Sequence, residues 1–219
     1  MKQLAIFSLV FLFVGGCTKF GKNMTVKGRV LNPITGEKIP NAPLIMYRST
    51  LDYPSGKKKV KETKTDSEGY FEISKASLSK CYLTCNVTEV GDYYPIGWEK
   101  KDDIPLFDAF TISIKKGKTM HADYYAVPYG ELKISIHNVN CQGANDTLIY
   151  KRSYVSLNGI SVFQPFTLTG CYDNDGVFAK VPSGEYLVEW TVIRNGTSND
   201  YTHIVSVPAN GQAYYNIDY

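Results

Sequence analysis

A short turn motif that occurs twice constrains the fold of this chain more than any other feature. The motif is Asp-x-x-Gly-x-Phe, found within Thr65–Ile73 and again at Asp173–Phe178. Asp and Asn side chains accept hydrogen bonds from backbone amides two residues on, and Gly tolerates a positive φ, so the motif predicts a tight turn. After Gly69, Phe71 and Ile73 fall on one face, which is typical of a strand with one buried side. Two copies therefore predict two related β-modules in tandem.

The composition also favours strands. The chain has 219 residues, enough for one or two domains, and it contains 17 Tyr and 10 Phe. Aromatic and β-branched residues are enriched in β-sheets. We therefore expect an all-β chain with two tandem β-sandwich domains, one spanning residues 24–128 and the other residues 129–219.

The amino terminus carries an export signal. Lys2 precedes an apolar run, Leu4–Val14, in which Ser8 is the only polar residue. This run is shorter than the roughly 20 residues that cross a bilayer core, so it predicts a signal peptide over residues 1–16. An ordinary signal peptide with a cysteine nearby by chance is the alternative to a lipoprotein signal.

The end of the apolar run, Val14–Cys17 (VGGC), resembles the bacterial lipobox. The resemblance implies cleavage before Cys17 and lipidation of Cys17, with residues 17–23 forming a linker. Two or more acyl chains together anchor a protein stably, so we expect a membrane partner through the lipid. Thr18 is not the Asp that would retain such a lipoprotein in an inner membrane, so the outer membrane is favoured. The periplasmic and cell-surface faces both stay open.

Three segments of the first predicted domain resemble, in order, the carboxypeptidase regulatory-like family. They are Val26–Val30, Thr35–Leu44 and Thr65–Phe71. Members of this family are prealbumin-like β-sandwiches, related in shape to immunoglobulin-like domains. The resemblance implies a non-catalytic accessory module, because the zinc and catalytic residues of carboxypeptidases lie in a different domain.

A candidate binding site lies in the segment Gly91–Asp108, which we predict to be a long loop. The segment carries Tyr93, Tyr94 and Trp98. Long loops in compact domains are often functional, and exposed aromatic rings can stack on sugar rings. The alternative is that these rings cap one end of the sandwich.

The four cysteines that follow Cys17 separate into two pairs. Cys81 and Cys85 share one face of a predicted strand, and four residues along a strand span about 13 Å, beyond the roughly 7 Å that a disulfide allows between Cα atoms. Buried free thiols are therefore favoured for these two. Cys141 and Cys171 lie near strand ends in the second predicted domain, and an exported chain meets an oxidising compartment. We predict a Cys141–Cys171 disulfide.

Charge gives little indication of a partner. The net charge is +3, and no clustered basic face indicates a nucleic-acid partner. The run Lys57–Lys59 predicts a solvated hairpin loop, with an anionic partner as the alternative. The segment Asp173–Gly176 could be a calcium loop, but it offers too few oxygen ligands, and a satisfied turn is favoured.

No pattern of catalytic or metal-binding residues emerges. His121, His137 and His203 are scattered, and neither a Gly-x-Ser-x-Gly elbow nor a phosphate-binding glycine loop occurs. His121 shares a predicted strand face with Asp123, which by itself indicates a rim residue. Asp146–Leu148 resembles the O-glycosylation site of Bacteroidetes proteins.

These observations lead to one function hypothesis and two rivals. We expect no metal, no cofactor and no enzymatic activity. The chain is predicted to be a lipid-anchored envelope protein that acts as a structural or protein-interaction module. The first alternative is a glycan-binding lipoprotein that uses the loop aromatics. The second is a hydrolase whose site the sequence does not reveal.

Overall fold

The structure is a computed structural model that describes residues 22–50, 56–100, 110–157 and 164–219. These residues form fifteen β-strands and one three-residue 3₁₀ helix, η2 (Val87–Glu89). The expected all-β class is confirmed. No described helix is long and apolar enough to cross a membrane.

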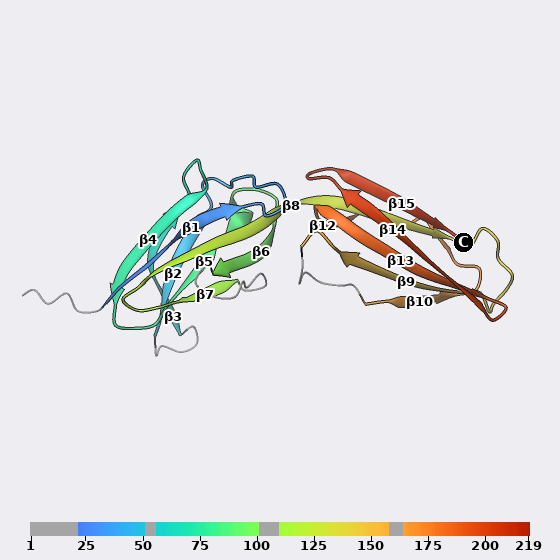
Figure 1. The fold of residues 1–219 in the computed structure, drawn as a ribbon, viewed down its shortest axis with the longest axis horizontal. Coiled ribbons are helices and arrows are strands. Elements are labelled where there is room, and N and C mark those ends of the chain that lie inside the picture. Colours follow the sequence, from blue (N-terminus) through green and yellow to red (C-terminus); the bar gives the residue numbers. More distant parts are fainter. Residues whose placement is uncertain (1–21, 51–55, 101–109, 158–163) are drawn as a thin grey trace, which may run out of the picture.

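The first module is a sandwich of two sheets (Figure 1). One sheet has the order β4-β1-β8-β6, and the facing sheet has the order β3-β2-β5-β7. The strands are β1 (Lys22–Leu31), β2 (Pro43–Ser49), β3 (Lys57–Lys64), β4 (Tyr70–Ser77), β5 (Cys81–Cys85), β6 (Tyr93–Lys100), β7 (Thr111–Ile114) and β8 (Thr119–His137).

The second module is a sandwich that begins with the second half of β8. This half of β8 lies between β15 on one side and the short strands β11 and β12 on the other. The facing sheet has the order β10-β9-β13-β14. The strands are β9 (Thr147–Tyr154), β10 (Phe166–Thr169), β11 (Asp173–Asn174), β12 (Ala179–Pro182), β13 (Gly184–Arg194), β14 (Thr197–Val207) and β15 (Gln212–Asp218).

The two modules share one strand topology, which confirms the expected tandem arrangement of sandwiches. In each module the first strand pairs in parallel with the last strand: β1 with β8 in the first module, and β8 with β15 in the second. In each module the facing sheet joins the equivalent four strands in the same order. Strand β6 is the exception, because no described strand of the second module occupies the equivalent place beside β15.

Strand β8 belongs to both modules. It is 19 residues long, and at about 3.3 Å per residue it extends over roughly 60 Å. Strand β6 pairs with it as far as Pro128 in the first module, and β12 pairs with it from Tyr129 in the second. The expected boundary between residues 128 and 129 therefore falls inside a hydrogen-bonded strand, with no loop between the two sandwiches.

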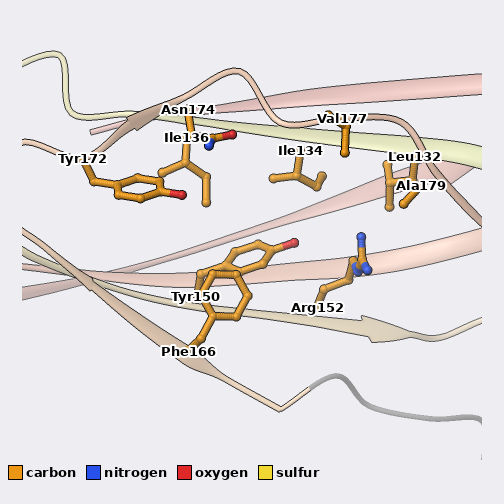
Figure 2. A pocket seen from close by; sticks show the side chains of 10 residues that line it. All are labelled: Leu132, Ile134, Ile136, Tyr150, Arg152, Phe166, Tyr172, Asn174, Val177 and Ala179. Carbon is orange, nitrogen blue, oxygen red and sulfur yellow. The ribbon is translucent and has the colours of Figure 1, made fainter.

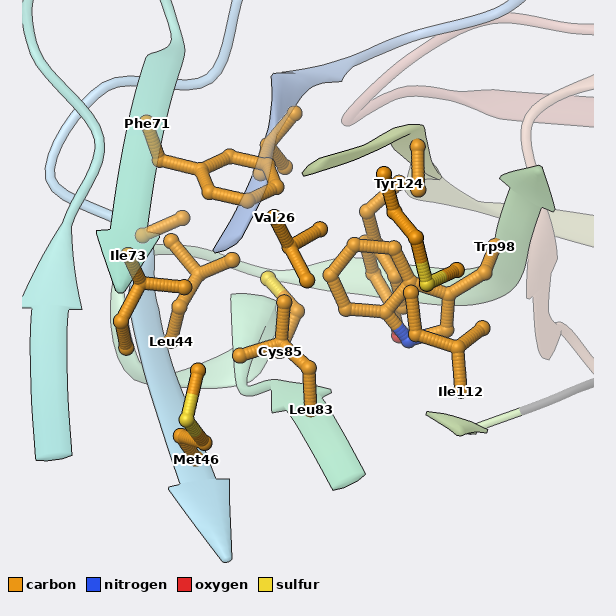
Figure 3. Packing of buried hydrophobic residues seen from close by; sticks show 14 of the residues in the cluster. Val26, Leu44, Met46, Phe71, Ile73, Leu83, Cys85, Trp98, Ile112 and Tyr124 are labelled. Atoms are coloured by element: carbon orange, nitrogen blue, oxygen red, sulfur yellow. The ribbon is translucent and has the colours of Figure 1, made fainter. Parts of the chain in front are cut away.

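Each module has its own hydrophobic core. In the first core, the Trp98 ring packs edge-on against Phe71 and Tyr124, with ring centroids 6.0 Å and 5.0 Å away (Figure 3). The second core centres on the Tyr154 and Tyr186 rings, whose centroids are 5.2 Å apart. The alternation of apolar and polar residues along the strands supplies both cores, because successive side chains point to opposite faces of a sheet.

The first Asp-x-x-Gly-x-Phe motif forms the predicted turn. The Asp66 carboxylate accepts hydrogen bonds from the backbone N–H groups of Glu68 and Tyr70, each at 2.9 Å. Gly69 has a φ of 65°, and a Cβ atom there would lie only 2.6 Å from the Val30 carbonyl oxygen. Only glycine fits this position without strain.

The second motif forms a similar turn through a different side chain. Here the Asn174 side-chain oxygen accepts a hydrogen bond from the Gly176 N–H at 2.6 Å. Gly176 has a φ of 62°, and a Cβ atom there would lie 2.2 Å from the Ile134 carbonyl oxygen. Both glycines thus sit against a carbonyl of the strand that opens their module.

The two copies diverge after the glycine. Phe71 pairs with Gly28 on the core face and is 2% exposed. In the second module Ala179 pairs with Leu132 instead, so the chain has gained one residue relative to the first module. A one-residue shift turns side chains to the opposite face of a strand. Phe178 accordingly lies outside the core and is 42% exposed.

Candidate functional site

The predicted loop aromatics do not form an exposed platform. The expectation of a loop is wrong for Tyr93–Lys100, which forms strand β6, and residues 101–108 lie outside the described part of the chain. Trp98 is fully buried, because β6 pairs along β8 and turns the indole into the first core. The expectation that Trp98 is available to a glycan is therefore wrong.

Tyr93 and Tyr94 are half-buried. Tyr93 packs against the first core, and burial raises the pKa of its phenol. Tyr94 packs edge-on against Tyr129, with ring centroids 5.8 Å apart. Both rings are thus already used for packing near the end of the first module. Glycan binding by these two tyrosines stays an untested prediction.

The junction between the modules is built from side chains of both. Lys180 of the second module forms an ion pair with Asp92 of the first, with Nζ 2.5 Å from Oδ1. The same ammonium group lies 4.4 Å from the centre of the Tyr129 ring. The Tyr129 N–H donates to the Asp92 carbonyl oxygen at 3.0 Å. One exposed ion pair contributes little to stability by itself. Together, however, these contacts flank the continuous strand β8 and oppose bending of the two modules at Tyr129.

The four cysteines in the described part of the chain pair as the sequence predicts. Cys141 and Cys171 form a disulfide with Cα atoms 5.3 Å apart. Cys81 and Cys85 are free and buried in the first core, and burial raises the pKa of the Cys85 thiol. Cys17, the predicted lipidation site, lies outside the described residues.

A buried carboxylate organises the loops beside the disulfide. Asp146 accepts hydrogen bonds from the Gln142 backbone N–H at 2.9 Å, from the Asn138 side-chain amide at 3.0 Å and from Arg194 Nε at 3.1 Å. The Gln142 amide, then Asn138, then Arg194 hold the pKa of this carboxyl below its ordinary value. O-glycosylation at the neighbouring Thr147 stays an untested prediction.

The three histidines lie in separate surroundings. His121 and His137 are 16 positions apart on β8, which separates them by about 50 Å. His137 Nδ1 bonds to Asp173, and the His203 ring stacks on Tyr215 at 4.2 Å between centroids. Among the described residues, no group of three or more His, Cys, Asp or Glu side chains could hold a metal ion.

The lysine-rich segment is a strand instead of a loop. The predicted hairpin loop at Lys57–Lys59 is wrong, because these residues begin β3, the edge strand of its sheet. Lys59 pairs with Glu62 at 2.8 Å on the exposed surface. Charged side chains on an edge strand discourage pairing with other chains. The lysines therefore lie on an exposed sheet edge, a placement that sequence reasoning did not assign to them.

A pocket that sequence reasoning missed opens in the side of the second module (Figure 2). It has a volume of about 230 Å³ and lies between the two sheets. One wall comes from β8, β11, β12 and the residues next to β11, Tyr172 and Val177, and the other wall comes from β9 and β10. The lining residues are Leu132, Ile134, Ile136, Tyr150, Arg152, Phe166, Tyr172, Asn174, Val177 and Ala179.

One signal in the sequence could have indicated this pocket. Along β9 the side chains that face the core are Leu148, Tyr150, Arg152 and Tyr154. Arg152 interrupts an otherwise apolar or aromatic series, and an arginine on the core face of a sandwich strand is unusual. A charged residue at such a position indicates that solvent reaches this part of the space between the two sheets.

No protein-family model and no curated protein matches the chain. Among solved structures, it is similar to the Bacillus anthracis TIE protein (17% identity, TM-score 0.35), covering 90% of this chain and 34% of that one. It is also similar to GBS52, the minor pilin of Streptococcus agalactiae (11% identity, TM-score 0.34), covering 89% and 94% respectively. A DUF3823 family protein from Bacteroides uniformis has 13% identity and a TM-score of 0.34, covering 85% and 100%. The chain thus spans about a third of the TIE protein chain. TM-scores this low support no functional comparison.

Proposed function

We propose that this chain is a non-enzymatic, lipid-anchored envelope protein whose two β-sandwiches act as a stiff spacer and protein-interaction module. The observation that carries the proposal is strand β8, which runs unbroken through both sandwiches. A spacer needs a fixed length, and a shared central strand supplies one, whereas a loop linker would allow the modules to reorient.

The surface of the second module supplies the interaction part of the proposal. Strand β14 is an edge strand, and most of its residues are exposed. Tyr201 and Ile204 on β14 and Tyr214 on β15 are 48%, 55% and 73% exposed. An exposed edge strand offers unpaired backbone groups to a partner strand, and neighbouring apolar side chains add affinity.

The membrane part of the proposal draws on the amino terminus. Lipid on Cys17 would attach the first module to the outer membrane and direct the second module away from it. The resemblance of the first module to carboxypeptidase regulatory-like domains agrees with an accessory role that involves no catalysis. Glycan binding is not advanced as a second function, because Trp98 is buried.

The stiffness can be measured as a distance between the two modules. Spin labels placed through noncanonical amino acids at Leu78 and Tyr214, both well exposed, would be used in the full chain in nanodiscs. A single narrow distance distribution is expected. Insertion of a Gly-Ser segment after Tyr129 should broaden the distribution and serves as the sensitivity control. A distribution in the unmodified chain as broad as in the inserted one would refute the spacer proposal.

The anchor can be tested by metabolic labelling with palmitate in a bacterium that processes lipoproteins. Labelling is expected in the unmodified chain and is expected to be absent from Cys17→Ala. Cys81→Ala is the matched control, because it removes a cysteine from the core and leaves the anchor site intact. Retained label in Cys17→Ala would contradict the proposed anchor.

A further inference from the structure

One edge of β15 is open. Strand β15 pairs in parallel with β8 along its other edge, and no described strand pairs with the open one. On the paired edge, the Gly211 carbonyl accepts a hydrogen bond from the Glu131 N–H at 2.9 Å, and the Tyr219 N–H donates to a β8 carbonyl at 2.9 Å. Backbone groups alternate between the two edges of a strand, so the residues between them point their N–H and C=O groups outward at every second position. These residues are Gln212, Tyr214, Asn216 and Asp218.

The equivalent edge of the first module is filled by β6. This strand pairs antiparallel with the first half of β8 and places Trp98 opposite Tyr124. Tyr215 is the counterpart of Tyr124, because the two tyrosines pair with Ile134 and Val30, whose carbonyl oxygens lie against the two motif glycines. Tyr124 is fully buried, whereas Tyr215 is only half-buried. The described part of the second module therefore lacks a strand that would place a side chain opposite Tyr215.

The composition of β15 does not block this edge. Natural edge strands are often protected against pairing by lysine or proline. In the first module the edge strand β3 carries five lysines. Strand β15 has no Lys, Arg or Pro, and its only charged residue is Asp218. An edge strand with exposed backbone groups and no such protection can add a partner strand.

The open edge of β15 is complementary to itself. In a twofold dimer the same surface meets on both copies, so two identical edges pair antiparallel. With the twofold axis at Tyr215, Gln212 of one copy lies opposite Asp218 of the other. Tyr214 then lies opposite Asn216 of the other copy, and the outward backbone groups of all four residues are hydrogen-bonded. Asp218 meets an amide and not a second carboxylate, so no like charges face each other across the pair.

We propose that β15 pairs antiparallel with β15 of a second copy of this chain. The second copy supplies what β6 supplies in the first module: hydrogen bonds to a sheet edge, and an aromatic side chain, its own Tyr215, opposite Tyr215. Strand β1 begins at the end of the first module that is far from the second module (Figure 1). The amino termini of the two copies therefore lie at opposite ends of the pair. This inference rests on the interaction part of the proposed function and names its partner.

The test is the association state of the full chain in detergent micelles, followed by sedimentation velocity at rising protein concentration. A reversible monomer–dimer equilibrium is expected. Asn216→Pro removes one outward N–H from each copy, at a strand edge where proline is tolerated, and should weaken dimerisation at least about tenfold. Asn216→Val is the matched control, because it changes the same side chain and keeps the N–H, so it should dimerise like the unmodified chain. A chain that stays monomeric, or equal weakening by both variants, would overturn the proposal.

Cysteine cross-linking tests the register of the pair. Gln212→Cys and Asp218→Cys chains, mixed under mild oxidation, should form a cross-linked dimer, because opposite residues of a hydrogen-bonded pair have Cα atoms about 5.5 Å apart. Neither variant alone should cross-link, because each position lies about 20 Å from its own copy along the antiparallel pair. Cross-linking of either variant with itself as efficiently as in the mixture would overturn the antiparallel pairing.

A charge exchange keeps the proposal testable if Asn216→Pro does not fold. Gln212→Asp places a carboxylate opposite Asp218 of the second copy and should weaken dimerisation, and adding Asp218→Lys should restore it. Failure of the second substitution to restore the dimer would overturn the register.

The dimer and the spacer can fail separately. Labelled chain diluted with excess unlabelled chain reports distances within one copy only, so the spacer measurement does not depend on dimerisation. A monomeric chain with a narrow distance distribution would overturn the second-copy pairing and leave the spacer proposal intact. A dimer with a broad distribution would do the reverse.

Discussion

The two modules have the same strand order but close their cores differently. In the first module β6 covers one side and contributes the buried Trp98, and Phe71 closes a corner. In the second module β6 has no described counterpart, and Phe178 faces solvent. The turn motif is nearly the same in both modules, so the added strand and the register after the turn decide whether the sandwich is sealed.

The side without a β6 counterpart is packed by stacked rings instead. Trp190 on β13 stacks on Tyr201 of β14, with centroids 5.5 Å apart. Tyr215 of β15 lies 6.0 Å from Trp190 and stacks on His203 at 4.2 Å. Each of these rings thus contacts at least one other ring of the group. In the second module, aromatic side chains thus pack beside β15, where in the first module strand β6 pairs with β8.

The largest expected difference between the modules concerns the two motif phenylalanines. Phe71→Ala should destabilise the first module by about 3–5 kcal/mol, because it empties a fully packed site. Phe178→Ala should change the stability of the second module by less than about 0.5 kcal/mol, because its ring is largely outside the core. Urea titration followed by hydrogen exchange and mass spectrometry reports each module separately. Equal losses of stability in the two variants would show that Phe71 and Phe178 contribute equally to their modules.

The next effect concerns the disulfide, which only the second module has among the described residues. Replacing Cys141 and Cys171 with Ser should destabilise that module by roughly 3 kcal/mol, because the unfolded chain regains the freedom of a loop of about 30 residues. Reductant should have the same effect on the unmodified chain and should leave the first module unchanged. Loss of stability in the first module on reduction would show that its thiols are not free.

A smaller effect should be shared by both modules. Gly69→Ala and Gly176→Ala each place a Cβ within 2.6 Å of a backbone carbonyl at a positive φ. Each should destabilise its own module by more than about 1 kcal/mol. Gly196 is the matched control, because it has a φ of 79° and nothing within 4 Å of its Cβ position, so Gly196→Ala should cost less than either. Thermal unfolding measures all three.

The smallest expected effect is a loss of stability of the second module at low pH, caused by protonation of Asp146. The folded pKa of this carboxyl is lowered, so its contribution to stability is present above the unfolded pKa of about 3.9 and is lost as the pH falls through the folded value. Asp146→Asn should remove this part of the acid sensitivity. Thermal unfolding at pH 7 and pH 3 tests it, and an unchanged pH dependence in the variant would assign the sensitivity to other groups.

Local patterns predicted much of this fold. Strand alternation and the two turn motifs indicated tandem sandwiches, and the spacing of Cys81 and Cys85 indicated free thiols. These features depend on residues close together in sequence, for which strand periodicity and turn chemistry are direct guides. Cys141 and Cys171 are 30 residues apart, so no local pattern joins them. Their disulfide was predicted from the oxidising compartment of an exported chain and from their places near strand ends.

Features set by distant pairing could not be predicted. The segment Tyr93–Lys100 contains Pro95 and Gly97, which favour a loop, but pairing with β8 overrides that preference through a bulge. The outward turn of Phe178 depends on one extra residue against β8, which no motif reveals. The pocket depends on both sheets together, and Arg152 was its only local sign.

The continuity of β8 has a consequence for how the molecule can be divided. A protease that acts on exposed, unpaired chain finds no such segment at residues 128–129, so limited digestion should not release one sandwich intact. A fragment that begins after His137 would leave β12 and β15 without the strand that pairs with both. The second sandwich therefore cannot be produced alone unless its fragment keeps the part of β8 that follows Pro128.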